Sequence, residues 1–241
     1  MKSIGLIGGM SWESTALYYQ IINREVARRL GGLRSAQIHL RSLDFEEVVQ
    51  RQKSNAWGEL ARMLTDAGRG LEQAGADCVL IGTNTMHRVA PDVQAGLTVP
   101  LLHIADVTAR AINAAGCRSV ALLGTRYTME QGFYIERLAR HGIECIVPNA
   151  DHRDEVHRII FDELCQGVVS DESRENLRDI IAHQIARGAE GVILGCTELP
   201  MSLEQAHVEV PLFDTTRLHA LAAVDFALGT QREPAAEAEA A

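Results

Sequence analysis

Cys196 stands at a place in the chain where a thiol could act as an acid or a base. Residues 191–194 form a short apolar run, and a Gly-Cys-Thr-Glu turn follows at 195–198, before an apparent helix start. This order predicts a thiol at the carboxyl end of a buried strand, where open α/β sheets bind their ligands. Backbone N–H groups at a helix N-terminus favour the thiolate, so we expect the pKa of Cys196 to lie below the usual value of about 8.5. A single cysteine of this kind is more often a buried, inert side chain, so a second observation is needed.

An internal repeat supplies that second observation. Residues 81–84 match residues 194–197 at an offset of 113, and residues 72–77 match 185–190 at the same offset. Residues 6–8 match 122–124 at an offset of 116, and residues 99–102 match 210–213 at 111. Four matches in one order, with offsets that drift by only a few residues, indicate a duplicated unit. Thr83 therefore occupies in the first half the position that Cys196 occupies in the second.

The elements that would position these two side chains alternate between strand and helix. Continuous apolar runs predict strands at 3–8, 36–42, 78–81, 101–104, 119–123, 143–147, near 192 and at 211–213. Helical periodicity predicts helices at 11–30, 44–50, 57–73, 105–115, 129–140, 154–165, 171–187 and 215–228. The predicted fold is α/β, with two similar doubly wound parallel-sheet half-domains related by a pseudo-twofold axis and an active site in the cleft between them. We expect residues 1–103 plus 209–230 in the first half-domain, 104–208 in the second, and a disordered Pro/Ala/Glu-rich tail at 231–241.

Two such halves would place Thr83 and Cys196 on opposite walls of one cleft. A carbon atom held between them would meet an ionisable or hydroxyl group on each face. This arrangement suits the removal of a proton from one face of a carbon and its return to the other, as in racemisation or epimerisation.

Four segments of the chain resemble, in order, those of the aspartate/glutamate racemase superfamily, which uses no pyridoxal phosphate. They are residues 5–15, 83–87, 124–128 and 195–198, so the resemblance spans nearly the whole chain and is greatest to broad-specificity or L-aspartate/L-glutamate-type racemases. It implies an amino acid as substrate, no cofactor, and a homodimer. The family uses two cysteines, whereas this chain pairs Cys196 with Thr83. We therefore expect Cys196 to be the principal base, on the L face, and Thr83 to return the proton, through water or His87.

The resemblance also implies that the polar turns hold the substrate. Helix capping is an alternative role for the Ser, Thr and Asn residues among them. The candidate substrate-binding residues are Met10, Ser11, Gln52, Asn84, Thr85, Thr125, Tyr127, Thr128, Thr197 and Glu198.

Three departures from the family bear on the substrate. Met10 stands where glutamate racemases have Asp, which argues against a strict cell-wall glutamate racemase. An Arg that many aspartate racemases offer to a side-chain carboxylate is missing at 42–47, where Gln52 is the preferred substitute, and a family Lys is missing at 166–168. Both absences weaken the case for an acidic substrate side chain.

Composition excludes several other classes of protein. The net charge is −9 with 23 Lys and Arg residues, which argues against nucleic acid as a partner, and the chain lacks an apolar stretch long enough for a membrane span. We expect a cytoplasmic protein with reduced cysteines and no metal site, because the five cysteines are scattered and no His pair has ligand spacing. The glycines at 5, 8 and 9 do not form a dinucleotide-binding motif.

Three alternative functions remain open from the sequence. A decarboxylase or other lyase of the same superfamily needs one cysteine and would release carbon dioxide. A cysteine hydrolase would need an orienting His and acid that the sequence does not identify. A catalytically silent amino-acid-binding protein would bind ligand without α-proton exchange.

Overall fold

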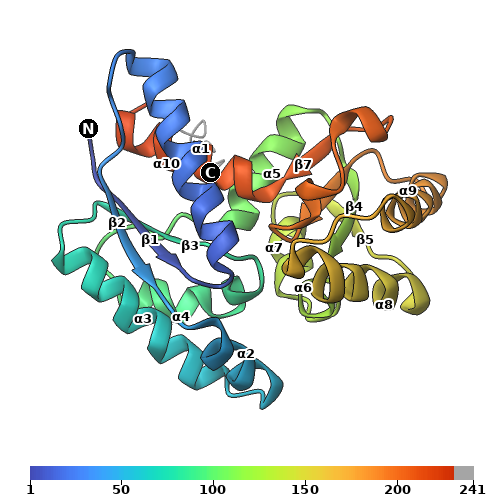
Figure 1. Ribbon diagram of the computed structural model, residues 1–241, viewed down its shortest axis with the longest axis horizontal. Coiled ribbons are helices and arrows are strands. Elements are labelled where there is room, and N and C mark those ends of the chain that lie inside the picture. Colours follow the sequence, from blue (N-terminus) through green and yellow to red (C-terminus); the bar gives the residue numbers. More distant parts are fainter. Residues whose placement is uncertain (231–241) are drawn as a thin grey trace, which may run out of the picture.

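The chain folds into two α/β halves that lie side by side (Figure 1). A computed structural model describes residues 1–230, so the predicted disorder of 231–241 lies outside the described residues. Both sheets are parallel. The first has the order β2-β1-β3, with β1 (Ile4–Gly8), β2 (Ile38–Ser42) and β3 (Cys78–Ile81). The second has the order β5-β4-β6-β7, with β4 (Ser119–Gly124), β5 (Glu144–Ile146), β6 (Val192–Gly195) and β7 (Leu212–Asp214).

The strand pairing reproduces the internal repeat. In the first sheet Ile7 pairs with Ile81, and in the second the equivalent Leu123 pairs with Leu194. An isolated bridge at Leu101 extends the first sheet beyond β3, where β7 extends the second beyond β6. The predicted α/β fold with two similar parallel sheets is therefore confirmed.

Helices cover both faces of each sheet, as the continuous apolar strands require. Alternate residues of β1 and β3 enter two separate cores, one beneath α1 and α10 and the other beneath α2, α3 and α4. The helices are α1 (Trp12–Leu30), α2 (Phe45–Lys53), α3 (Trp57–Gln73), α4 (Ala90–Ala95), α5 (Ile104–Ala114), α6 (Arg126–Glu130), α7 (Phe133–Ala139), α8 (Ala150–Arg158), α9 (Asp171–Ala186) and α10 (Thr215–Leu228). Shorter helical turns lie at 85–89, 159–163, 164–166, 199–201 and 205–207.

The last helix of each half packs on the other half. α5 follows the Leu101 bridge of the first sheet but buries Ile104 and Ala109 in the core of the second half. α10 follows β7 of the second sheet but buries Ala220 and Ala223 against α1 of the first half, and α5 and α10 also pack against each other. This exchange joins the halves along one side. It also corrects the expected boundary at 209, because β7 belongs to the second sheet and only α10 returns to the first half.

Three predicted elements outside the Cys196 turn differ from the structure. The strand expected at 101–104 is only a bridge, because the chain turns at His103, whose side chain caps α5. The helix expected at 129–140 is divided into α6 and α7 at Gly132, which has a φ of 64° that favours glycine. The helix expected at 154–165 starts earlier, after the cap Asn149, and loosens at 159–166 into π and 3₁₀ turns. None of the helices in residues 1–230 is long and apolar enough to cross a lipid bilayer.

Candidate active site

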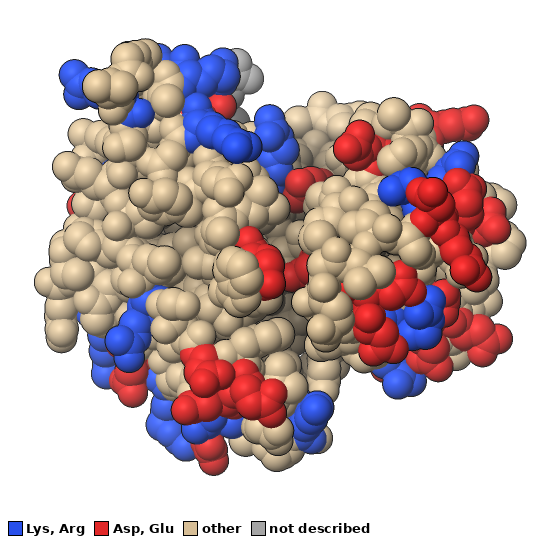
Figure 2. Space-filling view, viewed as in Figure 1, with Lys and Arg blue, Asp and Glu red and all other residues tan. Residues whose placement is uncertain are grey.

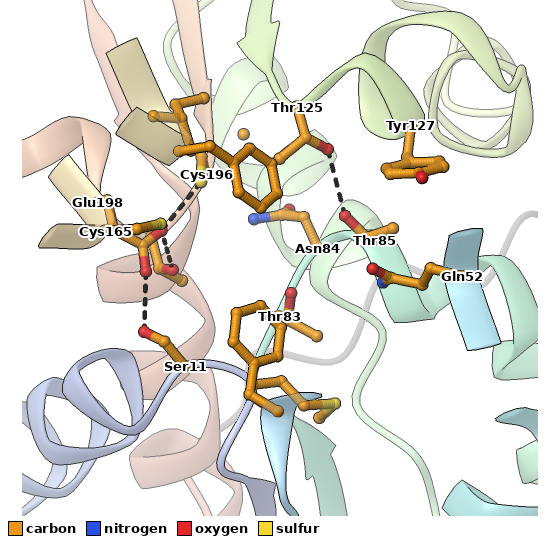
Figure 3. A pocket seen from close by; sticks show the side chains of 16 residues that line it. Ser11, Gln52, Thr83, Asn84, Thr85, Thr125, Tyr127, Cys165, Cys196 and Glu198 are labelled. Carbon is orange, nitrogen blue, oxygen red and sulfur yellow. Dashed lines mark hydrogen bonds between the residues drawn. The ribbon is translucent and has the colours of Figure 1, made fainter. Parts of the chain in front are cut away.

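A cavity lies between the two halves, at the carboxyl ends of the central strands (Figure 3). It is lined by every sequence-predicted catalytic and substrate-binding residue except Thr128. These lining residues are Met10, Ser11, Gln52, Thr83, Asn84, Thr85, Thr125, Tyr127, Cys196, Thr197 and Glu198. Thr128 lies directly behind the wall, fully buried. The strand-end turns of both repeats thus meet at one place, as the duplication predicts.

Cys196 follows β6 immediately, at a point where the chain approaches β4 closely. A Cβ atom on the preceding Gly195 would lie 2.9 Å from the backbone oxygen of Leu123, so only glycine fits there. Cys196 is 9% exposed as a residue, and its thiol donates a hydrogen bond of 2.9 Å from Sγ to Oε2 of Glu198. Burial, followed by the negative charge of Glu198, raises the pKa of this thiol well above its usual value.

The expectation of a lowered pKa at Cys196 is therefore wrong. The turn after Cys196 leads only to a 3₁₀ helix of three residues, Leu199–Met201, in place of the expected helix. So short a helix has little dipole to set against burial and a neighbouring carboxylate. A thiol whose pKa is raised in this way is protonated at neutral pH.

Glu198 accepts hydrogen bonds from four side chains of the protein. Oε1 accepts from the hydroxyls of Ser11 at 3.0 Å and Ser14 at 2.9 Å, and Oε2 accepts from Cys196 at 2.9 Å and Thr197 at 2.7 Å. Both serines belong to the start of α1, in the other half of the molecule. Ser11 is the N-cap residue of α1 but makes no side-chain capping bond, which leaves its hydroxyl free for Glu198. The carboxylate therefore orients the thiol and links the two halves.

Thr83 approaches the cavity from the end of β3, in the half opposite Cys196 (Figure 3). Within residues 1–230 its hydroxyl has no hydrogen-bond partner, whereas its backbone oxygen accepts from Nδ1 of His87 at 2.8 Å. Nε2 of His87 accepts from the backbone N–H of Ile104 at 3.2 Å. Burial lowers the pKa of His87 to about 4, so the ring is neutral. Because both ring nitrogens are committed to backbone groups, the expectation that His87 exchanges protons with the Thr83 hydroxyl is not met.

A cluster of three threonine hydroxyls joins the halves at another wall. Thr85 lies 3.3 Å from Thr125 and 3.5 Å from Thr128, and the latter two are 3.3 Å apart, measured between Oγ1 atoms. Thr125 also caps α6, so it has the capping role as well. Nearby, Nδ2 of Asn84 donates to Thr215 at 3.0 Å, while its buried Oδ1 has no partner among the described residues. Hydroxyl donors and an unused acceptor suit a ligand with both a carboxylate and an ammonium group.

The remaining wall contains residues that the sequence did not single out: Phe45, Ile160, Phe161 and Cys165. Phe45 follows the helix-capping Asp44 at the start of α2, and Gln52 projects from the same helix. Gln52 is 7% exposed, and its amide has no hydrogen-bond partner in the described part of the chain. Burial, with the charge of Glu198, raises the pKa of Cys165 to about 12.

Ser14 was also missed, although its sequence signal was available. It lies three residues after Ser11, on the same face of a helix that starts at the cleft.

Across residues 1–230, no group of three His, Cys, Asp or Glu side chains is arranged to hold a metal ion.

Known proteins share both the sequence pattern and the fold of this chain. The family model described as Asp/Glu/hydantoin racemase matches residues 7–223. The chain is similar to the broad specificity amino-acid racemase RacX of Bacillus subtilis, with 23% identity over 232 residues that cover 95% of this chain and 99% of RacX. A crystal structure from Yersinia pestis, of a protein assigned to the Asp/Glu racemases, is 51% identical with a TM-score of 0.90, covering 95% of this chain and 100% of that one. An aspartate racemase homologue from Pyrococcus horikoshii OT3 is 38% identical with a TM-score of 0.83 and the same coverage.

Proposed function

The chain belongs to the Asp/Glu/hydantoin racemase family, and from this premise we propose that it is an amino-acid racemase that acts without pyridoxal phosphate. Cys196 removes the α-proton on one face of the amino acid, with the help of Glu198. Thr83 returns a proton on the other face. The two side chains thus form an unequal acid–base pair.

The observation that carries this proposal is the equivalent position of Cys196 and Thr83 in the two repeats. Cys196 lies two residues after Leu194, which pairs with Leu123. Thr83 lies two residues after Ile81, which pairs with Ile7, the equivalent of Leu123. Both side chains line one cavity from opposite halves. A two-sided site of this kind is what inversion at a single carbon requires.

The first step uses Cys196 and Glu198 together. A bound amino acid brings an α-ammonium group into the cavity. Its positive charge offsets the negative charge of Glu198 and so lowers the free energy needed to form the thiolate. As the Cα–H bond breaks, Sγ takes the α-proton, and the original thiol proton passes along the Sγ–H···Oε2 hydrogen bond to Glu198. The products are a carbanion, a neutral thiol and a protonated Glu198, so charge is conserved.

The second step uses the hydroxyl groups. The carbanion delocalises its charge into the α-carboxylate, which the hydroxyls of Thr85 and Thr125 can stabilise as hydrogen-bond donors. Thr83 then donates its hydroxyl proton to Cα from the opposite face and recovers a proton from water. Glu198 releases its proton to the hydroxide that this leaves, so the starting protonation states of both side chains are restored. An unassisted threonine hydroxyl is a weak base, and no described side chain activates it. Proton abstraction should therefore be faster on the Cys196 face.

This asymmetry is visible in solvent exchange, not in net racemisation. The equilibrium constant between enantiomers is one, so kcat/KM for racemisation must be equal in both directions. Exchange of the α-hydrogen without inversion has no such constraint. We therefore expect faster deuterium uptake into the L enantiomer, the face assigned to Cys196.

The test is incubation with L- and D-amino acids in deuterated water, followed by proton NMR and chiral chromatography. We expect Cys196→Ala to abolish both α-deuterium uptake and racemisation. Cys117→Ala, at a buried cysteine that does not line the cavity, is the matched control and should keep both. Undiminished deuterium uptake in the Cys196 variant would refute the proposal.

A further inference from the structure

We propose that the cavity selects amino acids with an uncharged side chain over aspartate and glutamate. This inference rests on the proposed racemase function, whose substrate it narrows. The geometry that carries it is a side-chain wall of aromatic and aliphatic groups with one free amide, that of Gln52.

The cavity offers no positive charge to a second substrate carboxylate. Among the described residues that line it, none is Lys or Arg, and the one charged residue is Glu198. Figure 2 shows acidic side chains beside the groove between the halves. A buried carboxylate without a cationic partner is strongly disfavoured, and a neighbouring negative charge adds to the cost.

The arginines closest in sequence to the lining residues are engaged elsewhere. Arg51, beside Gln52, contacts Glu47 and Glu59, both at 3.4 Å. Arg126, beside Tyr127, contacts Asp154 at 2.9 Å.

Arg88 is likewise held away from the cavity. Its guanidinium lies 4.1 Å from the ring centroid of Trp57, and it donates to Gln131 at 2.5 Å. Trp57 in turn contacts Tyr127, which lines the cavity, with ring centroids 6.2 Å apart. The guanidinium is thus packed on Trp57 and bonded to Gln131, and Arg88 is not among the residues that line the cavity.

What the wall does offer suits a neutral side chain. Phe45, Ile160 and Phe161 provide apolar contact. Gln52 is more than nine-tenths buried as a residue, and its amide, without a partner among the described residues, has both a donor and an acceptor to offer. A substrate hydroxyl or amide can satisfy both groups, and a thioether or hydrocarbon can pack on the rings.

The decisive experiment compares substrates that have almost the same shape and differ in charge. Deuterium uptake at Cα is measured for L-glutamine against L-glutamate and for L-asparagine against L-aspartate. We expect kcat/KM for each amide to exceed that for its acid by at least about tenfold, because the acid would bury an unpaired charge. Equal values, or faster exchange with the acids, would overturn the inference while the racemase function stands.

A pair of variants on α2 tests the cause of the selectivity. Gln52→Arg supplies the missing cation and should raise glutamate exchange relative to glutamine by at least about tenfold. Gln50→Arg adds the same charge at an exposed position of the same helix and should leave the ratio unchanged. An unchanged ratio in the Gln52 variant would contradict the inference.

A binding measurement separates the two failures. If no amino acid shows exchange, the proposed function fails, and thermal stabilisation by the same four ligands then decides selectivity. Greater stabilisation by the amides than by the acids would support the uncharged-side-chain site, and the reverse order would overturn it.

Discussion

Replacing Glu198 by glutamine should make Cys196 more reactive and the enzyme less active. The carboxylate lies 2.9 Å from Sγ, and at an effective dielectric constant of about 20 a full charge at that distance opposes the thiolate by roughly 6 kcal/mol. Glutamine keeps the shape and removes the charge. If only a third of this energy, about 2 kcal/mol, is recovered after relaxation, the thiolate population rises by more than about tenfold. α-Proton exchange should fall by about a hundredfold or more, because the thiol has lost its proton acceptor.

The assay is alkylation by iodoacetamide at pH 8, with the modified cysteine identified by peptide mass spectrometry. Thr197→Val is the matched control: it removes a hydroxyl that donates to Glu198 and keeps the charge, so alkylation of Cys196 should change little. Thermal unfolding midpoints establish that both variants are folded. Slower or unchanged alkylation of Cys196 in folded Glu198→Gln would refute the assignment of Glu198 as a contributor, beside burial, to the raised pKa of the thiol.

Two further predictions concern the opposite wall and the buried histidines. Thr83→Cys should raise deuterium uptake into the D enantiomer by at least about tenfold, because a thiolate is a far better base than an unassisted hydroxyl; no gain in a folded variant would argue against Thr83 as the second acid–base group. Burial lowers the pKa of His87 to about 4 and that of His219 to about 3. Below the unfolded value of 6.5 the unfolded chain therefore binds more protons than the folded chain, and stability is lost as the pH is lowered. When the pH is lowered from 7 to 5.5, we expect each histidine to reduce the free energy of unfolding by about 1 kcal/mol, as measured by urea unfolding. The contribution of His219 should disappear in a His219→Gln variant. A free energy of unfolding that does not change with pH would contradict the assignment of both histidines as buried and neutral.

Most of the architecture follows from the internal repeat. The offsets near 113 predict that Ile81 and Leu194 occupy equivalent places, and each pairs with the equivalent residue of its central strand. Two long helices were also predictable, since those expected at 57–73 and 215–228 have the bounds of α3 and α10. In α3 the apolar residues recur with the helical period, so local sequence and tertiary packing favour the same structure.

The protonation state of Cys196 could not be predicted from the sequence. Glu198 is only two residues away, but whether its carboxylate faces the thiol depends on the geometry of the turn. The hydrogen bonds from Ser11 and Ser14 that hold it there come from a segment more than 180 residues earlier. Burial of the thiol likewise depends on how the two halves meet. A helix-dipole argument from local sequence therefore had the wrong sign.

The side-chain wall was missed for a different reason. Phe161 and Cys165 lie where α8 passes into π and 3₁₀ turns, so a regular helical period does not show which face they occupy. Their meeting with Gln52 of α2 depends on the arrangement of the two halves. Only the absence of the family Arg and Lys pointed from the sequence toward the same conclusion about charge.

The hydrogen bonds across the cleft connect the position of the halves to the chemistry of the thiol. Ser11 and Ser14 belong to the first half, and the carboxylate that they hold belongs to the second. If the halves separate, Glu198 loses two of its four donors and is freer to accept the proton of Cys196. If they close, the same donors stabilise the carboxylate anion and keep the proton on sulfur. The exchanged helices α5 and α10 join the halves along one side and so help to hold Ser11 and Ser14 against Glu198.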